Sequence, residues 1–142
     1  MINALSPLLF IPLTFARAAI SAPGEPAPIG VDLEFIEPRE PSFAEQYFTE
    51  EERALSLNGD APDTLLTALW CCKEAVSKAF GTGIGEKLDW HDLEIVHHDR
   101  GRPMVRLHGK AKVLLMELGG KDVHISLSHS DGQAAAMAVL EG

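Results

Sequence analysis

Three acidic side chains have the types and the spacing to hold a metal ion. Asp32 and Glu34 lie two residues apart in the segment GVDLE, and Glu74 lies in the segment WCCKEAVSK. Residues two apart in a strand share one face, with Cα atoms ~7 Å apart, so a cation can sit between the two carboxylates. Three carboxylates, completed by water and phosphate oxygens, form a shell that Mg²⁺ accepts. The alternative for the pair is an acidic strand face that only meets solvent.

Two lysines beside Glu74 carry the charge that a phosphate group needs. Lys73 precedes Glu74 directly, and Lys78 follows it by four residues. In a helix, Trp70, Glu74 and Lys78 share one face, which we expect opposite the apolar stripe. A Glu–Lys pair at this spacing more often only supports its helix, by ~0.2–0.5 kcal/mol. The spacing leaves a phosphate site and a solvated helix face both open.

Two further segments are suited to contact a phosphorylated ligand. The glycines of GTGIG (81–85) permit a close backbone approach. The hydroxyls and the imidazole of SLSHS (126–130) can hydrogen-bond to phosphate. A catalytic Ser/His pair is a competing interpretation of SLSHS, but no nucleophile-elbow pattern surrounds it. A polar strand end without function is the third interpretation.

A strand must position the first two acids. Residues 29–35 alternate between apolar and other side chains, which is the period of a half-buried strand. We expect Val31, Leu33 and Phe35 to point toward the core and to anchor the strand. The two acids then point to the opposite face.

A long helix must position Glu74 and the lysines. Apolar residues recur three and four positions apart over residues 65–80, and Gly81 is a suitable helix terminator. Before this helix, residues 43–48 are predicted to form a short helix. Thr49 and Glu52 have capping-box spacing, which predicts the start of another helix.

The rest of the chain is predicted to be mostly extended. The predicted elements are strands at 93–96, 104–107, 123–128 and 134–140, and a helix at 110–118. Strands and helices do not alternate strictly. We therefore expect an α+β fold in which a largely antiparallel sheet packs against the long helix.

Composition narrows the class of protein. The chain has 142 residues, with 21 acidic and 12 basic residues and a net charge of −9. That charge argues against nucleic-acid binding, which needs a basic surface. The adjacent cysteines, Cys71 and Cys72, define no disulfide framework, so we expect a reducing compartment, the cytoplasm.

The amino-terminal 28 residues are predicted to be an extension ahead of one domain at 29–142. Residues 2–24 are largely apolar, but Pro7 and Pro12 interrupt the run and no basic region precedes it. The run is too short and too interrupted to span a bilayer, so we expect no membrane association. We predict strand or irregular structure at 8–20, followed by a proline-rich connector at 21–30.

The motifs together resemble those of the 4′-phosphopantetheinyl transferases. In that family a G-[IV]-D strand motif is followed by W-x-x-K-E-A-x-x-K, and here the two read IGVDLE (29–34) and WCCKEAVSK (70–78). GRP (101–103) and SLSH (126–129) also fit the family pattern. The resemblance covers residues 29–140.

The resemblance implies a reaction and a role for each motif. Coenzyme A would donate its phosphopantetheine arm to a serine of a carrier protein and leave adenosine 3′,5′-bisphosphate. Asp32, Glu34 and Glu74 would hold Mg²⁺. Glu74 would also take the serine proton, directly or through a water. Lys78 would contact the phosphate under attack. The expected coenzyme-binding residues are Lys73, Lys78, Gly81, Arg102, Pro103, Ser128 and His129.

The resemblance also implies partners. The acceptor would be an apo acyl carrier protein, or a carrier domain of a peptide or polyketide synthase, with Arg39 and Arg53 as candidate docking residues. The chain's length and its SLSH match the small branch of the family, which favours a homo-oligomer, a trimer, with His129 supplied by a neighbouring subunit. Its GVDLE matches the larger, pseudodimeric branch, and a domain of a larger synthase stays possible. A catalytically silent coenzyme A-binding module and a pyrophosphate hydrolase are the alternative functions.

Overall fold

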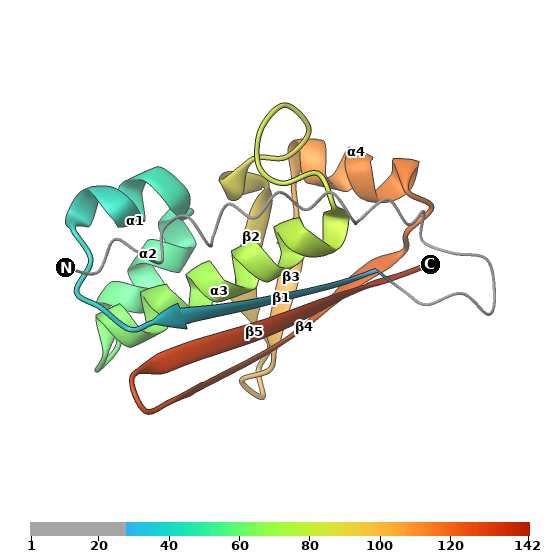
Figure 1. The fold of residues 1–142 in the computed structure, drawn as a ribbon. Helices are drawn as coiled ribbons and strands as arrows, with labels where there is room; N and C mark the ends of the chain where they lie inside the picture. Colours follow the sequence, from blue (N-terminus) through green and yellow to red (C-terminus); the bar gives the residue numbers. More distant parts are fainter. Residues whose placement is uncertain (1–27) are drawn as a thin grey trace.

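A strand, three helices, a hairpin, a fourth helix and two long strands follow one another along the chain (Figure 1). The computed structural model describes residues 28–142, so the predictions for residues 1–27 lie outside the described part. The elements are β1 (Ile29–Phe35), α1 (Pro41–Tyr47), α2 (Glu50–Leu57), α3 (Pro62–Phe80), the 3₁₀ helix η2 (Trp90–Asp92), β2 (Leu93–His97), β3 (Pro103–Leu107), α4 (Gly109–Glu117), β4 (Asp122–Ser130) and β5 (Gln133–Glu141). Each predicted element from residue 29 onward is present, with bounds shifted by a few residues.

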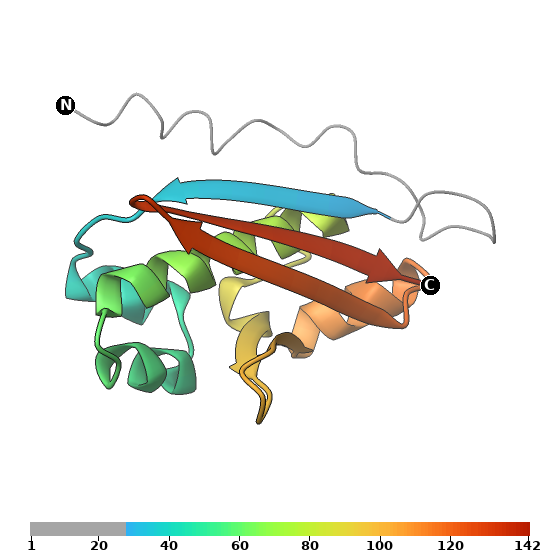
Figure 2. The same cartoon turned by 90° about the horizontal axis from the view of Figure 1, so that it is seen from below.

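The strands form two antiparallel sheets. In the larger sheet β5 lies between β1 and β4, and β2 and β3 form a separate hairpin. Helix α3 lies across one face of the three-stranded sheet, as the view onto the strands in Figure 2 shows. This arrangement confirms the predicted α+β fold with an antiparallel sheet against the long helix. Within residues 28–142, no helix is long and apolar enough to cross a membrane.

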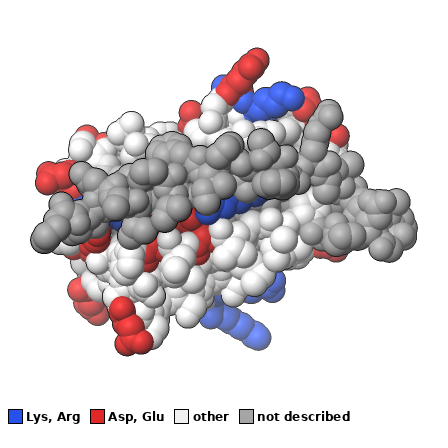
Figure 3. Space-filling model, viewed as in Figure 1, with Lys and Arg blue, Asp and Glu red and all other residues white. Residues whose placement is uncertain are grey.

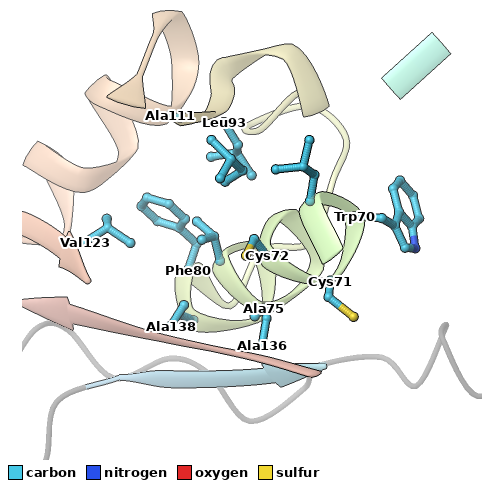
Figure 4. Packing of buried hydrophobic residues seen from close by; sticks show 14 of the residues in the cluster. Trp70, Cys71, Cys72, Ala75, Phe80, Leu93, Ala111, Val123, Ala136 and Ala138 are labelled. Carbon is cyan, nitrogen blue, oxygen red and sulfur yellow. The ribbon is translucent and has the colours of Figure 1, made fainter. Parts of the chain in front are cut away.

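Helix α3 runs through the middle of the core. It starts with a proline in its first turn and ends at Gly81, whose φ of 76° is the left-handed conformation that suits a helix end. Side chains such as Cys72, Ala75 and Phe80 pack between the sheet on one side and β2 and α4 on the other (Figure 4). The helix is buried almost all round, which excludes the alternative that Glu74 lies on a solvated helix face.

Strand β1 lies against α3 at backbone distance, and Gly30 makes this possible. A Cβ atom on Gly30 would lie 1.9 Å from the carbonyl oxygen of Ala75 and 2.6 Å from the amide nitrogen of Ala79. Contacts that short cannot occur, so any larger residue would force the strand off the helix. The glycine of the GVD motif therefore sets the distance between the two elements that carry the acids.

The same contact decides which way β1 faces. Because side chains alternate along a strand, Gly30, Asp32 and Glu34 all face α3. Asp32 is 3% exposed, whereas Val31 and Leu33 are 56% and 58% exposed on the outer face of the sheet. The prediction that Val31, Leu33 and Phe35 point inward was wrong. Their apolar character indicated a core-facing side, but the glycine contact gives that side to the acids.

Candidate active site

The strand and the helix bring the three predicted acids into one cluster. Asp32 and Glu34 face α3 from β1, and the charge of Asp32 raises the pKa of both Glu34 and Glu74. Glu74 lies on α3 and is 8% exposed. Lys78, one turn further along α3, donates to Asp32 with Nζ 2.7 Å from Oδ1, and also to the carbonyl of Val31 at 3.0 Å. The acids are thus near enough to affect one another's pKa, although no choice of one oxygen from each brings all three within 4.8 Å of one another. Their role as a joint metal site stays a prediction.

Crowding of negative charge dominates the electrostatics of this cluster. Burial raises the pKa of Glu34 to about 8, and the charges of Asp32 and Glu74 add to this rise, while Arg39 opposes it. Burial also raises the pKa of Glu74 to about 7, with a further contribution from Asp32 and an opposing one from Lys78. Protons or a cation must therefore compensate the cluster near neutral pH.

The cluster fits a hard divalent cation. Oδ2 of Asp32 and Oε1 of Glu34 are buried and have no hydrogen-bond partner among the described residues. Buried carboxylate oxygens without partners are costly, and an oxygen-seeking cation would satisfy both. Asp32 and Glu34 thus offer oxygens that suit Mg²⁺, and the assignment of Glu74 as a third ligand stays a prediction.

The two lysines of the motif lie in different environments. The side chain of Lys78 is 21% exposed, so its ammonium can reach an anion at the surface of the cluster. Lys73 is fully buried and donates to the carboxylate of Glu52 at 2.7 Å and to the carbonyls of Tyr47 and Trp90, each at 2.9 Å. An ammonium has three donors, and these partners use all three. The expectation that Lys73 contacts the coenzyme does not fit this arrangement and is corrected.

The remaining predicted residues lie outside the acid cluster. Gly81 ends α3, and Arg102 and Pro103 lie at the turn of the β2–β3 hairpin. His129 pairs with Ala134, which pairs in turn with Glu34, so His129 is two strands, roughly 10 Å, from the acid. Ser128 pairs with Ala135, whose other partner is the outward-facing Leu33, so Ser128 lies on the opposite face of the sheet from His129. One chain does not bring these residues to the acids.

Sequence reasoning missed the partner of Lys73. Glu52 was assigned only to a capping box, and that capping box is present. The backbone amide of Thr49 donates to the carboxylate of Glu52, and the backbone amide of Glu52 donates to the hydroxyl of Thr49. The sequence does indicate that Lys73 is buried. It lies four residues after Leu69 and three before Val76, which places it on the apolar stripe of α3. A lysine at a core position needs a buried anion.

Comparisons with known proteins agree with this geometry. The family model of the 4′-phosphopantetheinyl transferase superfamily matches residues 28–138. The chain is 37% identical over 120 residues to a holo-[acyl-carrier-protein] synthase of Caldanaerobacter subterraneus subsp. tengcongensis, covering 80% of this chain and 94% of the relative.

Solved structures give the same result. The holo-[acyl-carrier-protein] synthase of Neisseria meningitidis superposes with a TM-score of 0.74 at 26% identity, over 80% of this chain and 97% of that one. A holo-(acyl-carrier-protein) synthase of Bacillus anthracis str. Ames, in complex with CoA (3′,5′-ADP), gives 0.68 at 33% identity, over 82% and 96%. The glycine contact, the acid cluster and these matches have one explanation: the chain belongs to the 4′-phosphopantetheinyl transferase superfamily.

Proposed function

We propose that this chain transfers the 4′-phosphopantetheine arm of coenzyme A to a serine of an apo acyl carrier protein, with Mg²⁺, and releases adenosine 3′,5′-bisphosphate. The observation that carries the proposal is the pair of unpartnered buried oxygens on Asp32 and Glu34, close enough to Glu74 for their charges to interact and next to a partly exposed Lys78. The relatives named as holo-acyl-carrier-protein synthases support the choice of substrates.

The residues of this chain divide the work of the transfer. The serine oxygen forms a bond to the phosphorus next to pantetheine, and the bond from that phosphorus to the bridging oxygen breaks. Glu74 takes the serine proton, a role suited to a carboxyl whose pKa is raised to about 7. Lys78 exchanges part of its contact with Asp32 for an oxygen of the phosphate under attack. When bound, Mg²⁺ neutralises the charge that builds on the phosphate oxygens.

The test is the intact mass of apo carrier proteins incubated with the chain, coenzyme A and Mg²⁺. The transferase adds the mass of one phosphopantetheine arm, and only when the chain is present. A silent coenzyme A-binding module leaves every carrier unchanged while still binding coenzyme A. A hydrolase releases free phosphopantetheine in the absence of any carrier. Either of the last two results would overturn the proposal.

The assembly is proposed to be a homo-oligomer, with a trimer favoured by resemblance to the small branch of the family. Large apolar side chains cover the β1 side of the sheet's outer face, and Val31 and Met137 lie directly opposite each other there. The exposed set is Ile29, Val31, Leu33, Phe35 and Met137. A surface of this kind favours contact with another protein surface. The His129 side chain of a neighbouring copy would then complete the site, since its own lies two strands away.

The carrier protein is proposed to dock near the amino end of α3. The chain's net charge of −9 opposes encounter with an acidic carrier, so local basic groups must guide it. Figure 3 shows more acidic than basic atoms at the end of the molecule that carries α1 and α2. Arg39 stacks over the ring of Phe43 at 4.8 Å and acts on Glu34, so Arg53, which is also half-buried, is the candidate to test separately from the acid cluster. Arg53→Ala should raise KM for the carrier at low salt and leave KM for coenzyme A unchanged.

A further inference from the structure

A fully buried ion pair lies behind the acid cluster. Lys73 and Glu52 are 0% exposed, and Nζ lies 2.7 Å from Oε1. Glu52 also accepts from the amide of Thr49 through Oε1, at 2.9 Å, and from the amide of Ile95 through Oε2, at 3.0 Å. With the two carbonyls bound to Lys73, every polar atom of the pair has a partner.

This pair joins elements that are far apart in the sequence. Lys73 belongs to α3 and Glu52 to α2, while the carbonyls come from Tyr47 at the end of α1 and from Trp90 in η2. The amide of Ile95 adds β2. The rings of Tyr47 and Trp90 also pack on Trp70 of α3, with centroids 4.9 and 4.6 Å apart. The helix is therefore fixed to α1, α2, η2 and β2 at one point.

Stability alone does not explain a buried pair at this position. Burial lowers the pKa of Lys73, and Glu52 opposes that change, as expected for a charge removed from water and then paired. Apolar side chains of similar volume often give equal or greater stability than a buried ion pair. What a pair with fixed hydrogen-bond directions adds is one defined orientation of the helix.

We propose that Lys73 is a positioning residue that sets the rotation of α3, so that its neighbour Glu74 faces the acids of β1. Adjacent residues of a helix point about 100° apart. When Lys73 is held toward α2 and β2, Glu74 is directed toward β1, where Gly30 fixes the separation. The inference rests on the proposed function, because it assigns Glu74 the work that positioning serves.

The test compares Lys73→Met, Glu52→Gln and the double variant with wild type, and uses Lys112→Met on the exposed face of α4 as control. Each single change leaves one buried partner unmatched and should lower the midpoint of thermal unfolding. The double variant should be less destabilised than the sum of the single ones. In the folded double variant kcat should fall roughly tenfold to a hundredfold, while KM for coenzyme A stays within about twofold.

Other outcomes overturn the proposal. A raised KM for coenzyme A with unchanged kcat would make Lys73 a coenzyme ligand. Wild-type kcat in the double variant would show that the pair positions nothing. Calorimetric Mg²⁺ affinity, measured without carrier protein, should weaken in the double variant and not in Lys112→Met. If the Mg²⁺ affinity of the double variant is unchanged, the positioning role of Lys73 is overturned, whether or not any carrier is modified. If the wild type modifies no carrier but the double variant still binds Mg²⁺ more weakly, only the proposed function is contradicted.

Discussion

Lys78 and Asp32 connect the helix to the strand through a 2.7 Å ion pair at the edge of the acid cluster. The pair occupies only one oxygen of Asp32 and leaves the other buried without a partner among the described residues. The ammonium of Lys78 therefore compensates only part of the negative charge that the buried carboxyls of this cluster carry when ionised.

Replacement of Glu74 by glutamine should abolish transfer and leave the fold intact. The amide has the shape of the protonated acid but cannot take a proton, so kcat should fall by about 10²–10⁴. The thermal midpoint at pH 8 should be equal or higher, because repulsion from Asp32 is removed. The rate of holo-carrier formation and a thermal melt check both points. Near-normal turnover would refute the role of Glu74.

Stability of the metal-free protein should fall as the pH rises from about 5 to about 8. The pKa values of Glu34 and Glu74 are raised from 4.5 to about 8 and about 7. The folded state therefore binds protons more tightly than the unfolded chain, and this stabilisation is lost as pH passes through the folded pKa values. Melts with a chelator at several pH values measure the effect.

Mg²⁺ should restore much of that loss at high pH, because it compensates the same charges. The variant that carries both Glu34→Gln and Glu74→Gln is the control, and its melting temperature should depend far less on pH and on Mg²⁺. A wild-type melting temperature that is flat across this range, or that rises with pH, would contradict the account of the cluster.

Gly30→Ala should destabilise the protein strongly. The new methyl group meets backbone atoms of Ala75 and Ala79, which cannot turn aside as a side chain would. Overpacking typically costs 1–3 kcal/mol, and we expect about 3 kcal/mol or more here. Gly59→Ala is the matched control, since its Cβ would find ordinary contacts at 3.6 Å. Denaturant unfolding of the two variants checks the difference, and equal stability would contradict the close approach.

Leu33→Glu should split the proposed oligomer. The side chain is 58% exposed in the single chain, so the charge should do little harm to the fold but should disrupt an apolar contact between copies. Leu57→Glu, at a position that is 73% exposed on α2, is the control. Light scattering gives the mass of each variant. An unchanged mass for Leu33→Glu would exclude this face as the interface, and transfer activity should fall together with the mass.

The sequence predicts the elements and most of the cluster, and its failures have physical causes. Lys78 pairs with Asp32, and Glu34 and Glu74 are close enough for the charge of Asp32 to raise the pKa of each, whereas the shared metal site stays a prediction. The facing of β1 was predicted wrongly because alternation defines two faces without saying which one meets the helix. That choice depends on the contact of Gly30 with Ala75 and Ala79, which are 45 or more positions away in the sequence. A pattern within one short segment cannot predict a contact with such distant residues.

The two lysines illustrate the same limit. Motif position assigned both Lys73 and Lys78 to phosphate, yet only Lys78 keeps an exposed ammonium. The difference depends on Glu52, a residue of another helix. The roles of Arg102, Pro103, Ser128 and His129 stay predictions, because they depend on a bound ligand or on a second copy of the chain. The trimer and the cytoplasmic location also stay predictions, since a single chain determines neither.

The outward apolar side of β1 has a consequence for how the protein should be handled. If chains associate through that side, each copy depends on its neighbours for solubility as well as for a complete site. Specific activity, expressed per chain, should then decline on dilution, and dilute samples should adsorb to surfaces and lose material. Enzyme assays at nanomolar and micromolar concentration would give different apparent turnover for the same preparation.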